Sequence, residues 1–360
     1  MKKVLTIGFL ISISNYFYSQ KYIGASQELF FGRQSSAKIE AMGQASTAIT
    51  GDLSSVYFNP AGISDLKGAQ VYNNISKGFF LVDSAVSNFF GIGSKLGEKW
   101  AVAYNLQSFK YNSVFTDANG VIIPIKDRPN LIHKLSSSYK PIKTLSIGIS
   151  VNLLDPLMLK AFEFVKFNRT LFLDFGIIKE FSLFKNGFQQ HKLNLGASIS
   201  NFANSKSKFE YNNNVSTDYL PVTNRYGINY DFTLSKNWLI DSLNTCEISV
   251  VADYSFLLNS KYYSGYNVGC QLEMFDFLSA RIGYYSRSND IEQYLQILNR
   301  KNAFTYGFGL SLPIYKLTKI PLQVNFDYCN LPQDNSSTSP NNYSFPNFNS
   351  FTGSIRWFFK

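Results

Sequence analysis

Few residues in this chain have the types and spacing that enzyme active sites need. Only two histidines are present, His133 and His191, and they lie far apart in the chain. A Ser-His-Asp arrangement or a metal site with histidine ligands is therefore hard to assemble. The motifs G-x-S-x-G and H-E-x-x-H and the phosphate-binding loop are also missing. We therefore expect no enzyme activity, no catalytic residue, no cofactor and no metal site.

Seven ionisable residues occur in stretches that otherwise alternate apolar with small polar residues. They are Asp174, Glu247, Asp253, Glu273, Arg281, Asp327 and Arg356. On the inner face of a barrel these residues could line a polar channel or lock a plug in place. Alternatively, they could pair with one another to stabilise a filled interior, and this second interpretation is favoured. In a hairpin that turns near residues 275–277, Arg281 lies diagonal to Glu273, close enough to pair.

A stiff corner, Asn59-Pro60-Ala61-Gly62, precedes the strand-like part of the chain. Asn59 is pushed out of the helical region by the proline that follows, and Pro60 fixes its own φ. Gly62 lets the chain leave in a conformation that other residues resist. Before the corner, small and apolar residues recur at roughly helical spacing; they are Ala37, Ala41, Met42, Ala45, Ala48 and Ile49. This spacing predicts a short helix that packs closely against a wall.

The composition indicates what kind of wall this is. Aromatic residues make up 16% of the 360 residues, with 33 Phe and 23 Tyr, while charged residues are also only 16%, against about a quarter in ordinary soluble domains. No window of about eighteen apolar residues follows the N-terminal region, so membrane-spanning helices are excluded. High aromatic content, low charge and short apolar runs are typical of a transmembrane β-barrel.

The dominant period from about residue 68 onward is two, as in strands. In residues 144–152 four apolar side chains alternate with Ser, Gly and Asn, and the same pattern recurs at 171–177, 193–200, 248–256, 304–312 and 322–328. A soluble β-sandwich also alternates, with its polar face in water. Here the polar face consists mostly of Ser, Gly, Asn and Thr, not of Lys and Glu. This favours a barrel with apolar residues outside and polar residues inside.

Counting these stretches predicts an all-β fold, an antiparallel barrel of about fourteen strands. The expected strands lie at about 68–77, 79–93, 98–110, 131–140, 143–153, 168–180, 190–202, 220–234, 244–258, 262–274, 278–288, 302–312, 320–331 and 348–359. Long polar connections, at about 111–130, 154–167, 203–219, 289–301 and 332–347, alternate with short ones. Long external and short periplasmic connections are the pattern of bacterial outer-membrane barrels.

Glycines on the expected inner face predict that something fills the barrel. They are Gly148, Gly176, Gly196, Gly227, Gly269, Gly283, Gly307 and Gly309. Glycine within a strand often marks the close approach of another backbone. Residues 35–66 are the available object, so we expect them to form a hatch in the lumen. Gly91 and Gly93 interrupt the second strand, where a lateral opening of the wall could lie.

The N-terminus has the pattern of an export signal. Lys2 and Lys3 precede an apolar run over residues 4–13, and Ser19 is a small residue at the expected cleavage point. We therefore expect a signal peptide at 1–19, an N-terminal segment with the hatch at 20–66 and the barrel at 67–360. The expected location is the outer membrane of a Gram-negative bacterium. The net charge of +10 then suits contact with anionic lipid headgroups, not nucleic acid.

Residues 37–64, AKIEAMGQASTAITGDLSSVYFNPAGIS, resemble the N-terminal signature of the FadL-like outer-membrane superfamily, and more narrowly that of its PorV/PorQ branch in Bacteroidota. Residues 266–286, 304–313 and 322–332 are similar to recurring blocks of that branch. Lys38 stands where the branch usually has Arg, and Cys329 where a small residue is common.

The resemblance leads to two alternatives for function. The first is a non-enzymatic barrel that acts as a protein partner in type IX secretion or in the surface handling of exported proteins. The second is a FadL-like channel for the passive uptake of hydrophobic small molecules. The channel would need an apolar passage beside the hatch, and the polar character of the expected lumen face favours the first alternative.

Overall fold

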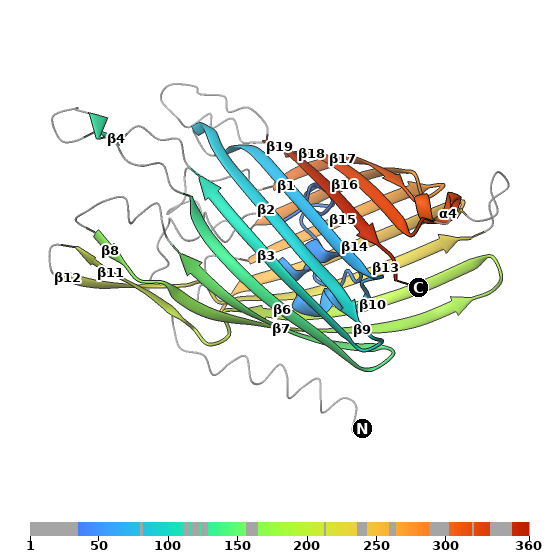
Figure 1. The fold of residues 1–360 in the computed structure, drawn as a ribbon, viewed down its shortest axis with the longest axis horizontal. Coiled ribbons are helices and arrows are strands. Elements are labelled where there is room, and N and C mark those ends of the chain that lie inside the picture. The colour runs from blue at the N-terminus through green and yellow to red at the C-terminus, as the bar shows by residue number, and fades with distance from the viewer. Residues whose placement is uncertain are drawn as a thin grey trace.

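Fourteen strands form one closed antiparallel barrel (Figure 1). The computed structural model describes residues 35–79, 82–110, 115–116, 122–123, 129–155, 165–211, 214–235, 243–258, 264–287, 302–318, 320–331 and 348–359. The barrel strands are β1 (Ala69–Phe79), β2 (Val82–Leu96), β3 (Trp100–Lys110), β6 (Asn130–Ile142), β7 (Leu145–Asp155), β9 (Thr170–Lys185), β10 (Gln189–Ser200), β13 (Thr223–Leu234), β14 (Cys246–Leu257), β15 (Ser264–Met274), β16 (Leu278–Arg287), β17 (Asn302–Leu312), β18 (Leu322–Leu331) and β19 (Phe348–Trp357). The predicted fold class and strand count are confirmed.

The barrel closes by pairing its first strand with its last. Val71 of β1 lies opposite Ile355 of β19 on one side and Ile92 of β2 on the other. The predicted strand ends are close to the observed ones, except that β9 continues past the expected end at residue 180 to Lys185. We call the end of the barrel with the short hairpin turns the turn end, and the end with the long connections the loop end.

Each strand divides its side chains between two environments, as the alternation predicted. In β7, Ile149 and Val151 are 45% and 43% exposed on the outer face, while Ser150 and Asn152 are fully buried on the inner face. Exposed Trp100 and Trp357 lie on the outer face at the turn end. An apolar outer surface with aromatic residues near its edge is the surface that a barrel presents to a lipid bilayer.

The hatch, residues 35–66, lies inside the barrel (Figure 1, blue). It consists of the helix α3 (Ala37–Ala41) and two 3-10 helices, η2 (Leu53–Tyr57) and η3 (Pro60–Asp65). The N-terminal helical unit predicted in the lumen is therefore present, but its helix is shorter than the spacing of small residues implied. The helix ends because Gly43 and Gln44 adopt positive φ of 66° and 71°, a conformation that terminates helices.

The long connections contain strands that the sequence did not predict. β8 (Val165–Phe167), β11 (Lys206–Tyr211) and β12 (Asn214–Tyr219) form a separate sheet in the order β12-β11-β8. Figure 1 shows this sheet beyond the barrel, at the loop end; we call it the platform. β4 (Phe115–Thr116) and β5 (Ile122–Ile123) form another pair, and a short helix, α4 (Ile314–Leu317), lies at the turn end. No helix in the described ranges is long and apolar enough to cross a membrane.

Candidate functional site

Inward-facing glycines let the hatch backbone lie directly against the barrel wall. A Cβ added at Gly148 would come closer than 3.0 Å to Pro60 and Ala61, a distance that real Cβ atoms do not show. The other glycines that meet the hatch in this way are Gly176 at Asn59, Gly196 and Gly227 at Thr47, Gly269 at Met42, Gly283 at Gly43 and Gly307 at Ala41. Gly309 differs, because an added Cβ there would meet the side chains of Asp327 and Arg281. These contacts explain why the inner wall needs glycine.

Asn59 uses both ends of its amide in the corner that the sequence singled out. Its Oδ1 accepts a hydrogen bond from the Ala61 amide at 3.0 Å, which caps η3, and Pro60 occupies the first turn. Its Nδ2 donates to the carbonyl of Thr47 at 2.8 Å and to those of Ile177 and Ala197 at 3.3 and 3.4 Å. The side chain is fully buried. Asn59 therefore joins two parts of the hatch to β9 and β10.

Gly62 closes the hatch on itself. Its carbonyl accepts a hydrogen bond from the Gly51 amide at 2.8 Å. A Cβ at this position would come too close to Ser55 Oγ and the Ile49 carbonyl. The glycine is therefore required by packing within the hatch, and not by a positive φ.

Asp253 anchors the hatch on the β14 side of the lumen. Its Oδ2 accepts hydrogen bonds from the amide of Ser46 at 2.7 Å, the amide of Thr47 at 2.9 Å and the hydroxyl of Thr47 at 2.7 Å. The side chain is buried at 5% exposure. A carboxylate that receives several donors is a strong acceptor. Of the seven predicted charges, Asp253 has the most direct contact with the hatch.

Arg356 and two threonines hold the hatch from the opposite strands. The Arg356 guanidinium donates to the Gly51 carbonyl at 3.1 Å. Thr352 Oγ1 accepts from the Ala37 amide at 2.8 Å, and Thr305 Oγ1 accepts from the Gly43 amide at 3.1 Å. The hatch is thus bonded to strands on several sides of the barrel.

Arg281 pairs with a different partner from the one expected. Its Nη1 lies 2.6 Å from Asp327 Oδ1, and its Nε donates to Gln271 Oε1 at 2.7 Å. Glu273 instead accepts weak hydrogen bonds from Gln271 and Ser279, both at 3.3 Å. The diagonal placement of Arg281 and Glu273 was right, but the predicted ion pair is wrong, because Asp327 offers a carboxylate at shorter range. Glu273 lies opposite Glu247 of β14.

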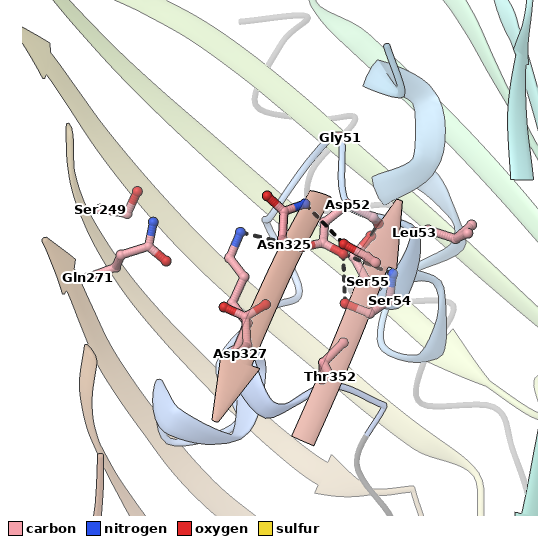
Figure 2. Close-up of polar contacts among 12 residues, drawn as sticks. Gly51, Asp52, Leu53, Ser54, Ser55, Ser249, Gln271, Asn325, Asp327 and Thr352 are labelled. Carbon is pink, nitrogen blue, oxygen red and sulfur yellow. Dashed lines mark hydrogen bonds and ion pairs between the residues drawn. The ribbon is translucent and has the colours of Figure 1, made fainter. Parts of the chain in front are cut away.

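These groups form a polar compartment between the hatch and strands β14 to β19. In Figure 2, Ser249 and Gln271 lie on one wall, and Asn325, Asp327 and Thr352 on strands nearer the hatch. On the hatch, Asp52 Oδ1 caps η2 by accepting from the amide and hydroxyl of Ser54 at 2.9 and 2.7 Å.

Lys38 forms an ion pair with Asp52 in this compartment. The Lys38 ammonium lies 3.3 Å from Asp52 Oδ2. Burial alone would raise the pKa of Asp52, but the nearby Lys38 charge and the hydrogen bonds from Ser54 together hold the pKa below its ordinary value. Asp52 therefore remains a carboxylate at neutral pH. Neither residue was predicted from the sequence to belong to the site.

The other side of the lumen is apolar. Four hatch residues, Leu53, Val56, Ile63 and Leu66, pack against the inner face of β1 to β3, where Tyr72, Phe89, Ala101 and Ala103 are buried. Gly93 admits the Leu53 side chain, since an added Cβ would lie 2.6 Å from Leu53 Cδ1. We call this contact the apolar seam. The expectation of a mostly polar lumen face did not predict this contact, although Ala101 and Ala103 alternate along β3 and Gly91 and Gly93 along the neighbouring β2.

The inner wall is also apolar at the loop end, above the seam. Phe109, Ile132, Leu154 and Phe172 face inward from β3, β6, β7 and β9, and none is more than 6% exposed. Leu220 and Val222, from the connection that carries the platform, are buried as well, at 0% and 1%. We call these six residues the apolar mouth.

Gly91 and Gly93 lie in an unbroken part of the wall. Gly91 pairs with Tyr72 on β1 and with Asn105 on β3, and the pairing continues through Gly93. The register of β1 and β2 shifts only nearer the loop end, between Lys77 and Phe79. A lateral opening at these glycines stays a prediction, and it would require this ladder to separate.

Both histidines are bonded to tyrosines on the outer face of the barrel. His133 Nδ1 lies 2.8 Å from the Tyr104 hydroxyl, and His191 Nδ1 lies 2.7 Å from the Tyr230 hydroxyl. Across the described ranges, no group of three or more His, Cys, Asp or Glu side chains is placed to hold a metal ion. The three cysteines, Cys246, Cys270 and Cys329, are free thiols.

The chain is similar in structure to outer-membrane hydrocarbon channels. Among them are the toluene transporter TodX of Pseudomonas putida (12% identity, 91% of this chain and 99% of that chain, TM-score 0.48) and TbuX of Ralstonia pickettii (11% identity, 91% and 99%, TM-score 0.48). A FadL homologue of Pseudomonas aeruginosa also has a similar structure (8% identity, 91% of this chain and 99% of that chain, TM-score 0.48). No family model matches the chain, and no curated protein matches it. The assignment to the PorV/PorQ branch stays a prediction.

Proposed function

We propose that the protein is an outer-membrane channel for hydrophobic small molecules, the second of the two alternatives raised by the sequence. The supporting observation is that the apolar mouth and the apolar seam lie on the same side of the lumen, along β1 to β9. An inner wall that only enclosed water would not carry phenylalanine side chains such as Phe109 and Phe172. Concave apolar surfaces with a few polar groups are typical of binding sites for hydrophobic ligands.

The seam continues the proposed path of the ligand from the mouth into the barrel. A ligand that enters at the mouth meets Tyr57 and Phe89, whose rings pack edge to face at 5.8 Å, and then the small residues Ala101, Ala103 and Gly93. Leu53 and Val56 of η2 occupy the seam. Passage therefore requires η2 to move into the polar compartment beside it.

Uptake of a labelled aromatic hydrocarbon by intact cells tests the proposal. Ala103→Phe places a ring in the seam and should reduce uptake at least several-fold, towards that of cells without the protein. Ala197→Phe is the matched control, because Ala197 faces outward from β10. Equal uptake with both variants, or no uptake above cells lacking the protein, would contradict the channel function. Surface expression is checked for each variant.

The partner in protein secretion is the second candidate, and the platform is the observation that favours it. Among the residues that the structure describes, β12 and β8 are the edge strands of the platform, and Val215 on β12 is 67% exposed. Free edges can pair with a strand of another protein. Purification of the tagged protein from mild detergent extracts tests this candidate. Stoichiometric recovery of secretion components supports it, and recovery of the barrel with apolar ligands alone argues against it.

The proposed location is the outer membrane of a Gram-negative bacterium, with lipid as the surrounding partner. The closed barrel with its apolar outer face supports this, because barrels of this kind satisfy all backbone groups internally. Fractionation of cells that express the protein tests the location. Recovery in the soluble fraction without detergent would contradict it.

A further inference from the structure

The carboxylate of Asp174 links the barrel wall to the loop end, and through Lys134 it is linked to the hatch. Its Oδ2 accepts hydrogen bonds from Lys134 Nζ at 2.6 Å and from Asn152 Nδ2 at 2.9 Å. Its Oδ1 accepts from the backbone amide of Asn201 at 2.9 Å. The Asp174 and Lys134 side chains are 4% and 10% exposed. A buried ion pair of this kind is stable only while all its hydrogen bonds are made.

The Lys134 side of this cluster contacts the hatch. Lys134 Nζ also reaches the carbonyl of Val56 at 3.5 Å and lies 5.8 Å from the centre of the Tyr57 ring. Both residues belong to η2, the part of the hatch that fills the apolar seam. Apart from the contact of the Leu53 side chain with Gly93, the hatch contacts with inward glycines lie at Ala41, Met42, Gly43 and Thr47 and at Asn59, Pro60 and Ala61. η2 lies between these two fixed regions.

The Asn201 side of the cluster holds the base of the platform. Asn201 has a φ of 56°, its Nδ2 donates to the Leu220 carbonyl at 3.0 Å, and its Oδ1 accepts from the Ser205 amide at 2.9 Å. The Leu220 amide in turn donates to the Ser205 carbonyl at 3.2 Å. Residues 201–205 and 220–222 therefore form a closed base from which β11 and β12 extend.

We propose that Asp174 couples the platform to the hatch, so that displacement of the platform base loosens η2. Moving the Asn201 amide away leaves Asp174 Oδ1 buried without its donor, so the carboxylate turns to satisfy that oxygen and loses its geometry with Lys134. Lys134 then no longer holds Val56 and Tyr57 against the wall. This inference rests on the proposed channel function in one respect, namely that a loosened η2 admits a hydrophobic ligand. The coupling itself does not depend on that function. Because coupling is reciprocal, a ligand that moves η2 also loosens the platform.

Hydrogen exchange of the full-length protein in detergent micelles tests the coupling. Asn201→Gly keeps the backbone donor and tolerates the positive φ, but it removes the side-chain bonds that close the platform base. We expect exchange of the η2 amides, residues 53–57, to become about tenfold faster, although the hydrogen bonds of Asn201 go to Asp174, Leu220 and Ser205 and not to the hatch. Asn204→Gly is the matched control, since Asn204 also has a positive φ, of 50°, in the same base; it should leave η2 unchanged.

A double variant separates coupling from general loosening. Asp174→Asn alone should also speed exchange of η2, and Asn201→Gly should add little in its presence, because both changes act on one contact. Faster exchange in residues 201–205 with no change in η2 would overturn the proposal, as would fully additive effects. Failure of hydrocarbon uptake with coupling intact would contradict the channel function only. Migration on gels with and without heating verifies that each variant forms the barrel.

Discussion

At the scale of single residues, the tightest requirement is for glycine where the hatch backbone meets the wall. Gly148→Ala places a methyl group of β7 against Pro60 and Ala61 of the hatch. Both segments are held in place by hydrogen bonds, so neither can easily move away. Overpacking of this kind costs about 1–3 kcal/mol. We expect the variant to have a less stable hatch, measured as faster cleavage within residues 35–66 by added protease.

Gly353→Ala is the control for this change. An added Cβ at Gly353 meets no atom within 4 Å, and in a strand alanine is slightly favoured over glycine. The control should therefore be as resistant to protease as the wild type. If both variants are equally resistant, the glycines do not determine hatch packing.

Asn59 permits an isosteric test of the corner. Asn59→Asp retains an oxygen to accept from the Ala61 amide, but replaces the donor to the Thr47, Ile177 and Ala197 carbonyls by an acceptor. A buried carboxylate facing carbonyl oxygens should destabilise the hatch by about 1–3 kcal/mol or more. Hydrogen exchange of the amides of residues 59, 61 and 62 measures the loss, and unchanged exchange at pH 7 contradicts this role.

At the scale of elements, η2 depends on the charge of Asp52. Its pKa in the folded protein is below that of the unfolded chain, so the carboxylate stabilises the hatch fully above about pH 4, and this contribution is lost as the pH falls through the folded value. Asp52→Asn should therefore lower the free energy of unfolding of η2 by about 1 kcal/mol at pH 7. The difference from wild type should shrink towards pH 2.

Exchange rates of the Ser54 and Ser55 amides, compared between wild type and Asp52→Asn at each pH, measure this dependence. The comparison cancels the intrinsic effect of pH on exchange, because both proteins share it. A difference that stays constant from pH 7 to pH 2 would show that the cap, and not the charge, carries the effect of Asp52.

The elements also show which parts of the fold and of the site could be predicted from the sequence. Alternation located the barrel strands because each face of a strand meets a different environment, and the inward glycines indicated an object in the lumen. The platform was missed for two reasons. β8 and β11 pair between two different connections, and β11 and β12, although they form a local hairpin, consist mostly of polar residues. The partner of Arg281 was missed because Asp327 belongs to a strand two positions further around the barrel. The apolar seam required knowing which hatch side chains face which wall.

At the scale of the whole molecule, fourteen strands enclose more space than wall side chains alone fill, and the hatch occupies that space. Removal of residues 35–66 leaves an inner wall lined mostly by Ser, Asn, Gly and charged groups such as Asp253, apart from the apolar residues of the seam and the mouth. Water can satisfy these groups, so the barrel is expected to remain closed. In planar bilayers the deletion variant should conduct ions in large, stable steps, while the intact protein should conduct little.

The deletion is informative only if the barrel has formed, which heat-dependent migration on gels establishes before the measurement. A folded deletion variant that conducts no more than the intact protein would mean that other parts of the chain close the lumen. Gly148→Ala provides an intermediate case, because it disturbs the hatch without removing it. Brief, irregular openings of that variant, between the levels of the intact protein and the deletion, would follow from a hatch that seals the barrel by its fit against the glycines.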